Sequence, residues 1–505
     1  MTELHWTEID QVPAIWANVP GPFRACLLFR TGRVDETLTS AGITHLIEHL
    51  AISSVNDGAL PHNGFVNGPM TGFITMGQPQ TVVDFLTAIC NFLSTLKSDR
   101  LENEKQVLAA ESAGRPYDFR SNLLTKRYGA AGYGLLGLPE LGLRKANLEQ
   151  LREYSAQKFT RENAVLWLSG PPPAGLRFNL PSGSKQPVPG LAPTHNTVPG
   201  WFVEDASGGI ASGSIVPRVS AASLFAEIAN RRLRERLRVD KSLSYSPAVL
   251  YEPISADIAH LILFADSQPE NRAELSAIFG EIVESLDKID ESDVEIARQQ
   301  TIDHWIGSLA PPPADRMMID LQRAAIDWLF GKEFETMETL AANLSSTTVE
   351  DVSKFSRSVQ ETAIFALPTG VSIKPFGKRI LPSRVPVIQG EKVFHLDSPI
   401  VVEHIQYGAD GVSVIWPDST HVTVRYAELS AVLSYDDGCV CLIGSDASIL
   451  NIEPTLWHNG QNVCRKIREK VPAQLILEQP PRPASSLPKP GTTAWQRFRA
   501  RLSKP

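Results

Sequence analysis

The sequence predicts an α+β protein: two similar domains, each a mixed sheet with helices, are joined by a Pro/Gly-rich linker and followed by a small β-barrel-like domain capped by one helix. Strand-like and helix-like apolar periods alternate in both halves of the first 372 residues. Prolines and glycines cluster between those halves, and the last third of the chain changes to short alternating runs separated by turn residues. We therefore place the two α+β domains at 1–170 and 201–372, the linker at 171–200, the small domain at 390–475 and a Pro-rich basic tail at 476–505.

The first segment reads as strands and helices in turn. Its helices are expected around the histidines near residue 45, where Ser40 or Thr44 is available as a cap, and over 80–97 and 101–112. Its strands are expected at 25–30, 72–76 and 164–168. The second segment repeats this plan, with strands at 210–216, 243–251, 258–264 and 363–367, and helices at 221–237, 270–287, 291–308, 314–330 and 348–357.

The third segment has a different texture. Five short β-rich runs with turn signals between them predict a meander of hairpins, and a helix is expected at 456–471. The hairpins carry aspartates rather than a basic cluster, which favours protein or peptide docking over contact with anionic lipid. For the tail, disorder is favoured over a short docking helix at 495–502.

The composition is that of a globular protein. The chain has 505 residues, of which 43% are hydrophobic and 21% charged. Its net charge of −8 argues against nucleic acid as a partner. No apolar run reaches the roughly 18 residues of a membrane helix, so a membrane partner is not expected.

The cysteines and the first residues predict a cytoplasmic location. There are five cysteines, an odd and scattered set, and residues 1–6 lack the basic and apolar regions of a secretory signal. Cys439 and Cys441 form a C-x-C pair. We interpret it as core packing rather than metal binding, because no second pair matches it.

The segment from His45 to His49 reads H-x-x-E-H, with Glu48 between the histidines. On a helix these three positions project from one face. Two imidazoles one turn apart suit zinc, and a carboxylate beside them can act as a base on a zinc-bound water. The motif can also arise by chance on an amphipathic helix, so a third ligand is needed.

Glu104 and Glu111 are the best candidates for that ligand. They are two helical turns apart and share a face. Taken alone, this spacing favours a solvated acidic stripe on an exposed helix.

Together, these residues resemble the pitrilysin/insulinase-type zinc peptidases, which include the processing peptidases. The resemblance covers about residues 10–370. It implies zinc bound by His45, His49 and Glu111, Glu48 as the catalytic base, and Glu104 behind the ligands. It further implies that Arg238 and Tyr245 in the second domain hold the substrate carbonyl and that Asn67 helps to bind substrate, although an ordinary turn asparagine is as good an interpretation of Asn67. His49 and Glu111 lie closer in the chain than is usual in the family.

The resemblance implies a zinc-dependent endopeptidase for unstructured peptides or for precursor and leader peptides. Family members of full length enclose substrate with four such domains, and this chain supplies two. A homodimer, or a heterodimer with a related half-size chain, is therefore expected. The alternatives are an obligate half-enzyme that needs a different partner subunit, and a non-catalytic scaffold or adaptor. The third segment resembles a pleckstrin-homology-like domain at the level of pattern alone.

Overall fold

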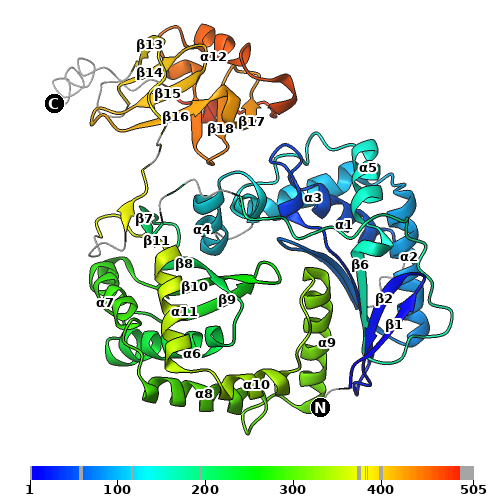
Figure 1. The fold of residues 1–505 in the computed structure, drawn as a ribbon. Coiled ribbons are helices and arrows are strands. Elements are labelled where there is room, and N and C mark those ends of the chain that lie inside the picture. The colour runs from blue at the N-terminus through cyan, green and yellow to red at the C-terminus, as the bar shows by residue number, and fades with distance from the viewer. Residues whose placement is uncertain are drawn as a thin grey trace, which may run out of the picture.

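The protein is described here from a computed structural model. The structure describes residues 3–55, 61–114, 118–192, 196, 198–371, 377–381, 383, 385–396 and 402–489. Residues 495–502, for which disorder was favoured over a short docking helix, lie outside the described residues. Figure 1 shows two α+β domains side by side, with a third, β-rich domain across one end of the pair.

The first domain is a mixed sheet with helices packed on one face. The strand order is β1-β2-β6-β3-β5-β4. Strand β6 is parallel to β2 and antiparallel to β3. The strands are β1 His5–Ile9, β2 Val12–Trp16, β3 Phe23–Phe29, β4 His62–Val66, β5 Thr71–Gly77 and β6 Ala164–Leu168. The helices are α1 Ile43–Ser53, α2 Pro79–Thr95, α3 Leu101–Gly114, α4 Phe119–Tyr128 and α5 Leu148–Lys158.

The second domain repeats this topology in strands β7 to β11, while its edge strand differs: β12 is parallel to β7, whereas β1 is antiparallel to β2. Its strand order is β12-β7-β11-β8-β10-β9, and β11 is parallel to β7 and antiparallel to β8. The strands are β7 Gly200–Val203, β8 Gly209–Pro217, β9 Ala248–Pro253, β10 Ile258–Asp266, β11 Ile364–Leu367 and β12 Lys378–Arg379. The helices are α6 Ala221–Leu233, α7 Arg272–Ser285, α8 Glu291–Trp305, α9 Pro313–Phe330, α10 Met337–Ser345 and α11 Val349–Thr362. The predicted α+β fold with two similar domains is confirmed.

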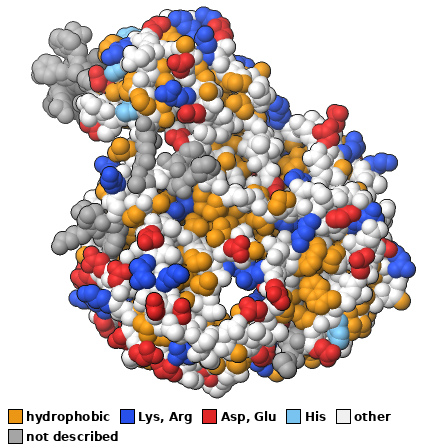
Figure 2. Space-filling model, viewed as in Figure 1, with side chains coloured by type: hydrophobic (Ala, Val, Ile, Leu, Met, Phe, Trp, Pro, Cys, Tyr) orange, Lys and Arg blue, Asp and Glu red, His pale blue; other side chains and the backbone are white. Residues whose placement is uncertain are grey.

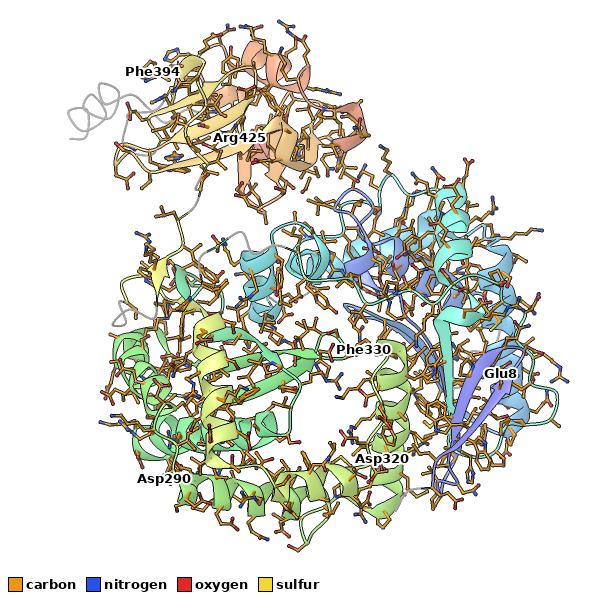
Figure 3. All side chains as sticks on the ribbon, viewed as in Figure 1. Glu8, Asp290, Asp320, Phe330, Phe394 and Arg425 are labelled. Carbon is orange, nitrogen blue, oxygen red and sulfur yellow. The ribbon has the colours of Figure 1, made fainter. Side chains whose placement is uncertain are left out.

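One helix of each domain packs against the sheet of the other domain. Leu123 of α4 packs with Phe202 and Ile262 on the open face of the second sheet. Conversely, α9 packs Leu321 and Phe330 against the first sheet, and Figures 1 and 3 show this helix standing beside β6, away from the rest of its own domain. This exchange covers the second face of each sheet at its central strands, which explains why β6 is apolar and buried at every position.

The expected linker is partly built into the first domain. Leu176, Phe178 and Leu180 are buried in that domain's core, and the Lys185 ammonium lies 3.8 Å from the ring centre of Trp328 on α9. The first half of the linker is therefore packed against the first domain and is not a free spacer.

A cavity of about 670 Å³ lies between β9, α9 and α10, lined by residues that include Tyr251, Trp305 and Arg323. Figure 2 shows an opening between α9 and the rest of the second domain, with acidic and basic side chains at its border.

The third domain has two sheets, with strand orders β13-β14-β15-β16 and β19-β18-β17-β20. Its strands are β13 Glu391–Phe394, β14 His404–Tyr407, β15 Gly411–Ile415, β16 His421–Arg425, β17 Leu429–Ser434, β18 Val440–Gly444, β19 Ile449–Ile452 and β20 Ile476–Glu478, with one helix, α12 Gly460–Arg468. The five predicted runs coincide with β14 to β18. The likeness to a pleckstrin-homology domain stays a prediction.

The start of the expected tail differs from the structure. Residues 476–478 form β20, which pairs in parallel with β17, and Arg482 binds the carboxylates of Asp437 and Glu453. The chain's Pro-rich composition had suggested a tail from residue 476, but backbone pairing and this ion pair hold the segment on the domain.

Among the described residues, no helix combines the length and the apolar character that a membrane span requires.

Candidate metal centre

Helix α1 carries the H-x-x-E-H residues and is held at both its N-terminus and its buried face. Leu46, Ile47 and Leu50 are fully buried in the core of the first domain. The first amides of the helix, those of Gly42 and Thr44, each donate to the Glu36 carboxylate at 2.8 Å. The expected caps, Ser40 and Thr44, were therefore wrong. The N-cap residue is Gly42, which has no side chain, and Glu36 reaches back from the preceding loop to accept from these amides.

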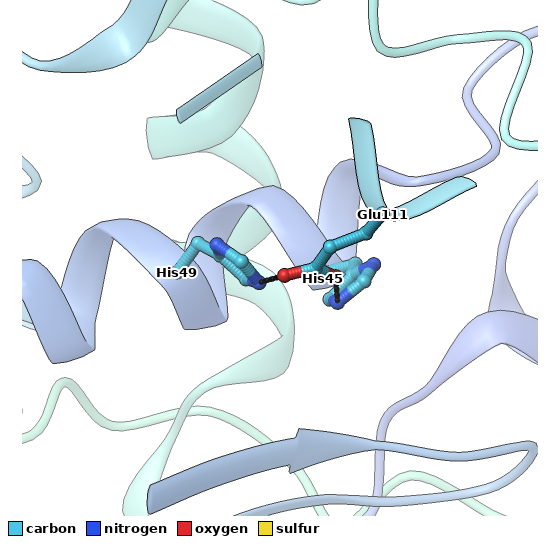
Figure 4. A group of neighbouring side chains, drawn as sticks. All are labelled: His45, His49 and Glu111. Atoms are coloured by element: carbon cyan, nitrogen blue, oxygen red, sulfur yellow. Dashed lines mark ion pairs between the residues drawn. The ribbon is translucent and has the colours of Figure 1, made fainter. Parts of the chain in front are cut away.

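Three potential metal ligands converge between α1 and α3 (Figure 4). Glu111 Oε2 lies 3.9 Å from His45 Nε2, and Glu111 Oε1 lies 3.5 Å from His49 Nε2. One ligand atom of each residue lies within 4.8 Å of the others. Each histidine therefore presents the same ring nitrogen to a shared point.

This donor set fits a zinc ion. Tetrahedral zinc with bonds of about 2.0–2.1 Å keeps its ligand atoms about 3.3–3.5 Å apart. The distances of 3.5 and 3.9 Å between Glu111 and the histidines are slightly longer, so small side-chain shifts would bring the three ligands to a zinc ion. Two imidazoles and one carboxylate also leave a coordination position open, as catalytic zinc sites do. The Glu111 side chain is 45% exposed, whereas those of the histidines are 15% and 18% exposed. The group is therefore accessible from the side of Glu111.

A buried carboxylate stands behind each histidine. His45 Nδ1 lies 3.2 Å from both carboxylate oxygens of Glu140, and His49 Nδ1 lies 3.4 Å from Glu104 Oε2. An acceptor at Nδ1 keeps the proton there and leaves Nε2 free to bind a metal. The other oxygen of Glu104 accepts from the Arg100 guanidinium at 3.0 and 3.1 Å.

The sequence interpretation placed Glu104 behind the ligands but missed Glu140. No periodic relationship connects residue 140 to the motif helix, because the contact depends on how a loop folds back. Glu104 is also buried instead of forming part of a solvated stripe.

Glu48 lies beside the metal group in a dry environment. It is 5% exposed, and its Oε2 is 3.8 Å from His49 Nε2. Burial raises the pKa of Glu48 to about 7, the charge of nearby His45 opposes this shift, and the Glu111 and Glu104 carboxylates add to it. A carboxyl group tuned in this way can exchange a proton near neutral pH.

Arg238 and Tyr245 contact each other but not the metal group. The Arg238 guanidinium lies 5.3 Å from the Tyr245 ring centre, and Tyr245 is 76% exposed. Among the contacts of the described residues, neither side chain reaches His45, Glu48, His49 or Glu111.

Tyr245 also lies in a loop, not in the strand expected at 243–251. Ser242 has a positive φ of 53°, and Asp266 accepts from the Ser244 hydroxyl and the Ser246 amide at 2.6 and 2.7 Å. These bonds hold the backbone away from the sheet until β9 begins at Ala248.

Asn67 closes the turn between β4 and β5. Its side-chain Oδ1 accepts from the Met70 backbone amide at 3.1 Å, and its backbone amide donates to the Met70 carbonyl at 3.0 Å. Its side chain therefore has a structural use, as in an ordinary turn.

Comparisons with known proteins identify the fold. The sequence matches no protein-family model and no curated protein. The structure is similar to a chain of complex III from Candida albicans, with a TM-score of 0.59, 15% identity, and coverage of 72% of this chain and 96% of that one.

Two bacterial structures are also similar. The periplasmic protease PqqL from Escherichia coli matches with a TM-score of 0.60 and 14% identity over 84% of this chain and 56% of that one, so the present chain corresponds to about half of PqqL. A peptidase M16 inactive domain from Pseudomonas fluorescens matches with a TM-score of 0.56 and 14% identity over 74% of this chain and 100% of that one. The fold is therefore the pitrilysin-like fold of M16 peptidases, which these neighbours present in proteases and in an inactive domain alike.

Proposed function

We propose that this protein is a zinc-dependent endopeptidase that cleaves unstructured peptides or leader-bearing precursors. The observation that carries the proposal is the convergence of two imidazole Nε2 atoms and one carboxylate, with a buried carboxylate behind each imidazole and Glu48 alongside. Zinc held by His45, His49 and Glu111 would supply a Lewis acid that activates a water molecule.

Glu48 is the proton carrier in this proposal. Its pKa of about 7, raised chiefly by burial, suits a group that takes a proton from water and later delivers it to the leaving amine. Its position next to the histidines keeps that proton within the site.

Strand β4 offers a place for an extended substrate. In the described part of the chain it is paired on one side only, with β5. Its Gly64 lies directly against Glu48. An extended peptide added to this edge would pair with backbone amides and carbonyls. This arrangement supports selection of unstructured peptides.

We further propose that the active unit contains two chains. Among the contacts of the described residues, Arg238 and Tyr245 do not reach the metal group of their own chain, so we take a second copy as the source of this pair. In a symmetric dimer, each chain would supply zinc ligands to one site and the Arg–Tyr pair to the other. Hydrogen-bond donors of this kind stabilise an oxyanion in the transition state.

The first test compares the zinc-loaded wild type with Glu48→Gln on a quenched pool of unstructured peptides. The variant should bind zinc and lose activity by about 10²-fold or more. Unchanged cleavage in the variant would refute the role of Glu48, and a wild type that neither binds zinc nor cleaves in the presence of any related chain would favour the scaffold alternative.

The second test mixes two variants that are inactive alone, Glu48→Gln and Tyr245→Phe. If sites form between copies, each mixed dimer contains one intact site, and activity should recover to about a quarter of wild type. No recovery, with mixed dimers present, would mean that the pair acts within its own chain or not at all. Activity that requires a different subunit would instead support the obligate half-enzyme. The likeness to a chain of complex III, a multi-subunit assembly, is consistent with that alternative.

A cytoplasmic location remains part of the proposal. It is supported by the five cysteines, all of which are free and buried.

A further inference from the structure

The third domain has two apolar faces on one of its sheets. Alternate residues of β17 and β18, such as Val432 and Leu442, point into the domain's own core. The residues between them, Ala431, Cys441 and Ile443, are also buried, but in a different cluster. A strand with one face on its own core and an equally apolar second face needs a second partner.

That partner is the first domain. The second face packs against Leu38, Ala130 and Leu135, with Leu138 and Leu141 at the edge of the cluster. The Ala130 amide donates to the Ser445 carbonyl at 2.8 Å. Leu38 and Leu135 are each 1% exposed, so the contact is closely packed.

The segment that the third domain covers includes Glu140, the carboxylate behind His45. The loop from Ala130 to Leu141 contains Glu140, whose carboxylate lies 3.2 Å from His45 Nδ1. Arg33 ties the loop together, because its guanidinium donates to the carbonyls of Leu135, Leu136 and Leu138 at 3.2, 3.3 and 2.9 Å. Its Nε also lies 3.7 Å from Glu140 Oε1.

We propose that the third domain positions Glu140, and through it His45, so that its contact with the first domain strengthens zinc binding. Apart from one short 3-10 turn at Gly132–Gly137, the loop from Ala130 to Leu141 has no regular structure. Leu135, Leu138 and Leu141 would lose this apolar cover without the third domain. Tyr133 and Gly134 stay tied to the first two domains by hydrogen bonds to Ile254 and Thr125. The loss of cover would therefore act on the end of the loop from Leu138 to Leu141, and Glu140 would then leave His45 for part of the time.

Two measurements test this proposal. The first, zinc affinity, rests on the proposed function, and the second, hydrogen exchange, needs no zinc. The test variant in the full-length protein is Ile443→Asp, which places a charge in the contact between domains. The matched control is Ile449→Asp, because Ile449 lies on β19 of the same sheet and is 54% exposed. Leu477→Asp, on the edge strand β20, is a second interface variant in case the first unfolds the domain.

The first readout is zinc affinity, measured by competition with a chelator. Ile443→Asp should weaken zinc binding roughly tenfold to a hundredfold, the usual effect of losing a carboxylate behind a metal-bound histidine, and Ile449→Asp should not. Glu140→Gln should have a similar effect, and the double variant Ile443→Asp/Glu140→Gln should be no weaker than Glu140→Gln alone, because both changes remove the same support. Additive losses, or an interface variant with wild-type affinity, would overturn the proposal.

The second readout is hydrogen exchange in the metal-free protein. Amides of residues 130–143 should exchange faster in Ile443→Asp than in Ile449→Asp, while β14 and β15 stay protected as evidence that the third domain is folded. Unchanged exchange in the loop would overturn the proposal. Because this measurement needs no zinc, it separates failure of the positioning role from failure of the proposed function.

Discussion

Gly64 on the edge strand β4 lies against Glu48 so closely that a methyl group on Gly64 would come within 1.8 Å of Glu48 Oε1. The absence of a side chain at residue 64 therefore sets the position of the carboxylate beside the metal group. It also brings the backbone of β4, the strand that an extended substrate would join, next to the group that handles the proton.

Gly64→Ala should therefore behave like a mild form of Glu48→Gln. The methyl group displaces the Glu48 carboxylate, and peptide cleavage should fall by about tenfold or more while zinc stays bound. Gly190→Ala is the control, because a methyl group there meets nothing within 4 Å. Cleavage of the peptide pool at wild-type rate by Gly64→Ala would contradict the account.

Glu104→Gln and Glu140→Gln should each weaken zinc binding roughly tenfold to a hundredfold, because each carboxylate orients one histidine through Nδ1. Chelator competition measures the effect. Glu102→Gln on the same helix is a suitable control, since the Glu102 side chain is 76% exposed and pairs with Lys105 instead. Equal affinities for all three variants would remove the positioning role of both carboxylates.

Zinc should also stabilise the first domain against heat. At a free zinc concentration about one hundred times the dissociation constant, binding contributes about 2.7 kcal/mol, which corresponds to a rise of about 5–10 °C in the midpoint for a domain of this size. Calorimetry with and without a chelator measures it. His49→Ala should show no such difference, and a shift that survives this substitution would place the zinc elsewhere.

His260 should make the protein sensitive to acid. It is 1% exposed on β10, and burial, with the nearby charge of Arg127, lowers its pKa to about 3. The folded state therefore binds a proton less readily than the unfolded state, whose histidine pKa is about 6.5. The stability is full above that value and is lost as pH falls towards about 3.

Between pH 7.5 and 5, protonation of His260 in the unfolded state should lower the free energy of unfolding by about 2 kcal/mol. Urea unfolding at the two pH values measures this loss of unfolding free energy. The loss should be larger by about 2 kcal/mol in the wild type than in His260→Gln. Equal losses in the two proteins would show that His260 is not the cause.

Arg482 should hold the C-terminal segment on the third domain. It donates to both oxygens of Glu453 at 2.6 and 2.8 Å and to Asp437 at 2.8 Å, and Glu453 is 7% exposed. Arg482→Met leaves a buried carboxylate without its cation and should destabilise the domain by about 2 kcal/mol. Hydrogen exchange in β18 and β19 reports the change, and Glu453→Gln added to Arg482→Met should restore part of it. Greater instability in the double variant would argue against the ion pair.

Several features followed from local sequence patterns. The strand and helix periods predicted two similar α+β domains, and the meander predicted the central strands of the third domain. Errors occurred at boundaries set by distant contacts. Residues 243–247 read as strand from their composition, but Asp266 holds them in a loop, and residues 476–478 read as tail, but they pair with β17.

The candidate site divides in the same way. His45, Glu48 and His49 lie one helical turn apart, and Glu104 and Glu111 lie two turns apart, so helix geometry alone places each set on one face. The sequence by itself therefore determined which residues could form a metal group. Only the tertiary structure decided that α1 and α3 bring these faces together, that Glu140 stands behind His45, that Gly64 touches Glu48 and that the third domain covers the loop of Glu140. The physical reason is that helical periodicity acts over a few residues, whereas these contacts join segments far apart in the chain and depend on how apolar faces pack against each other.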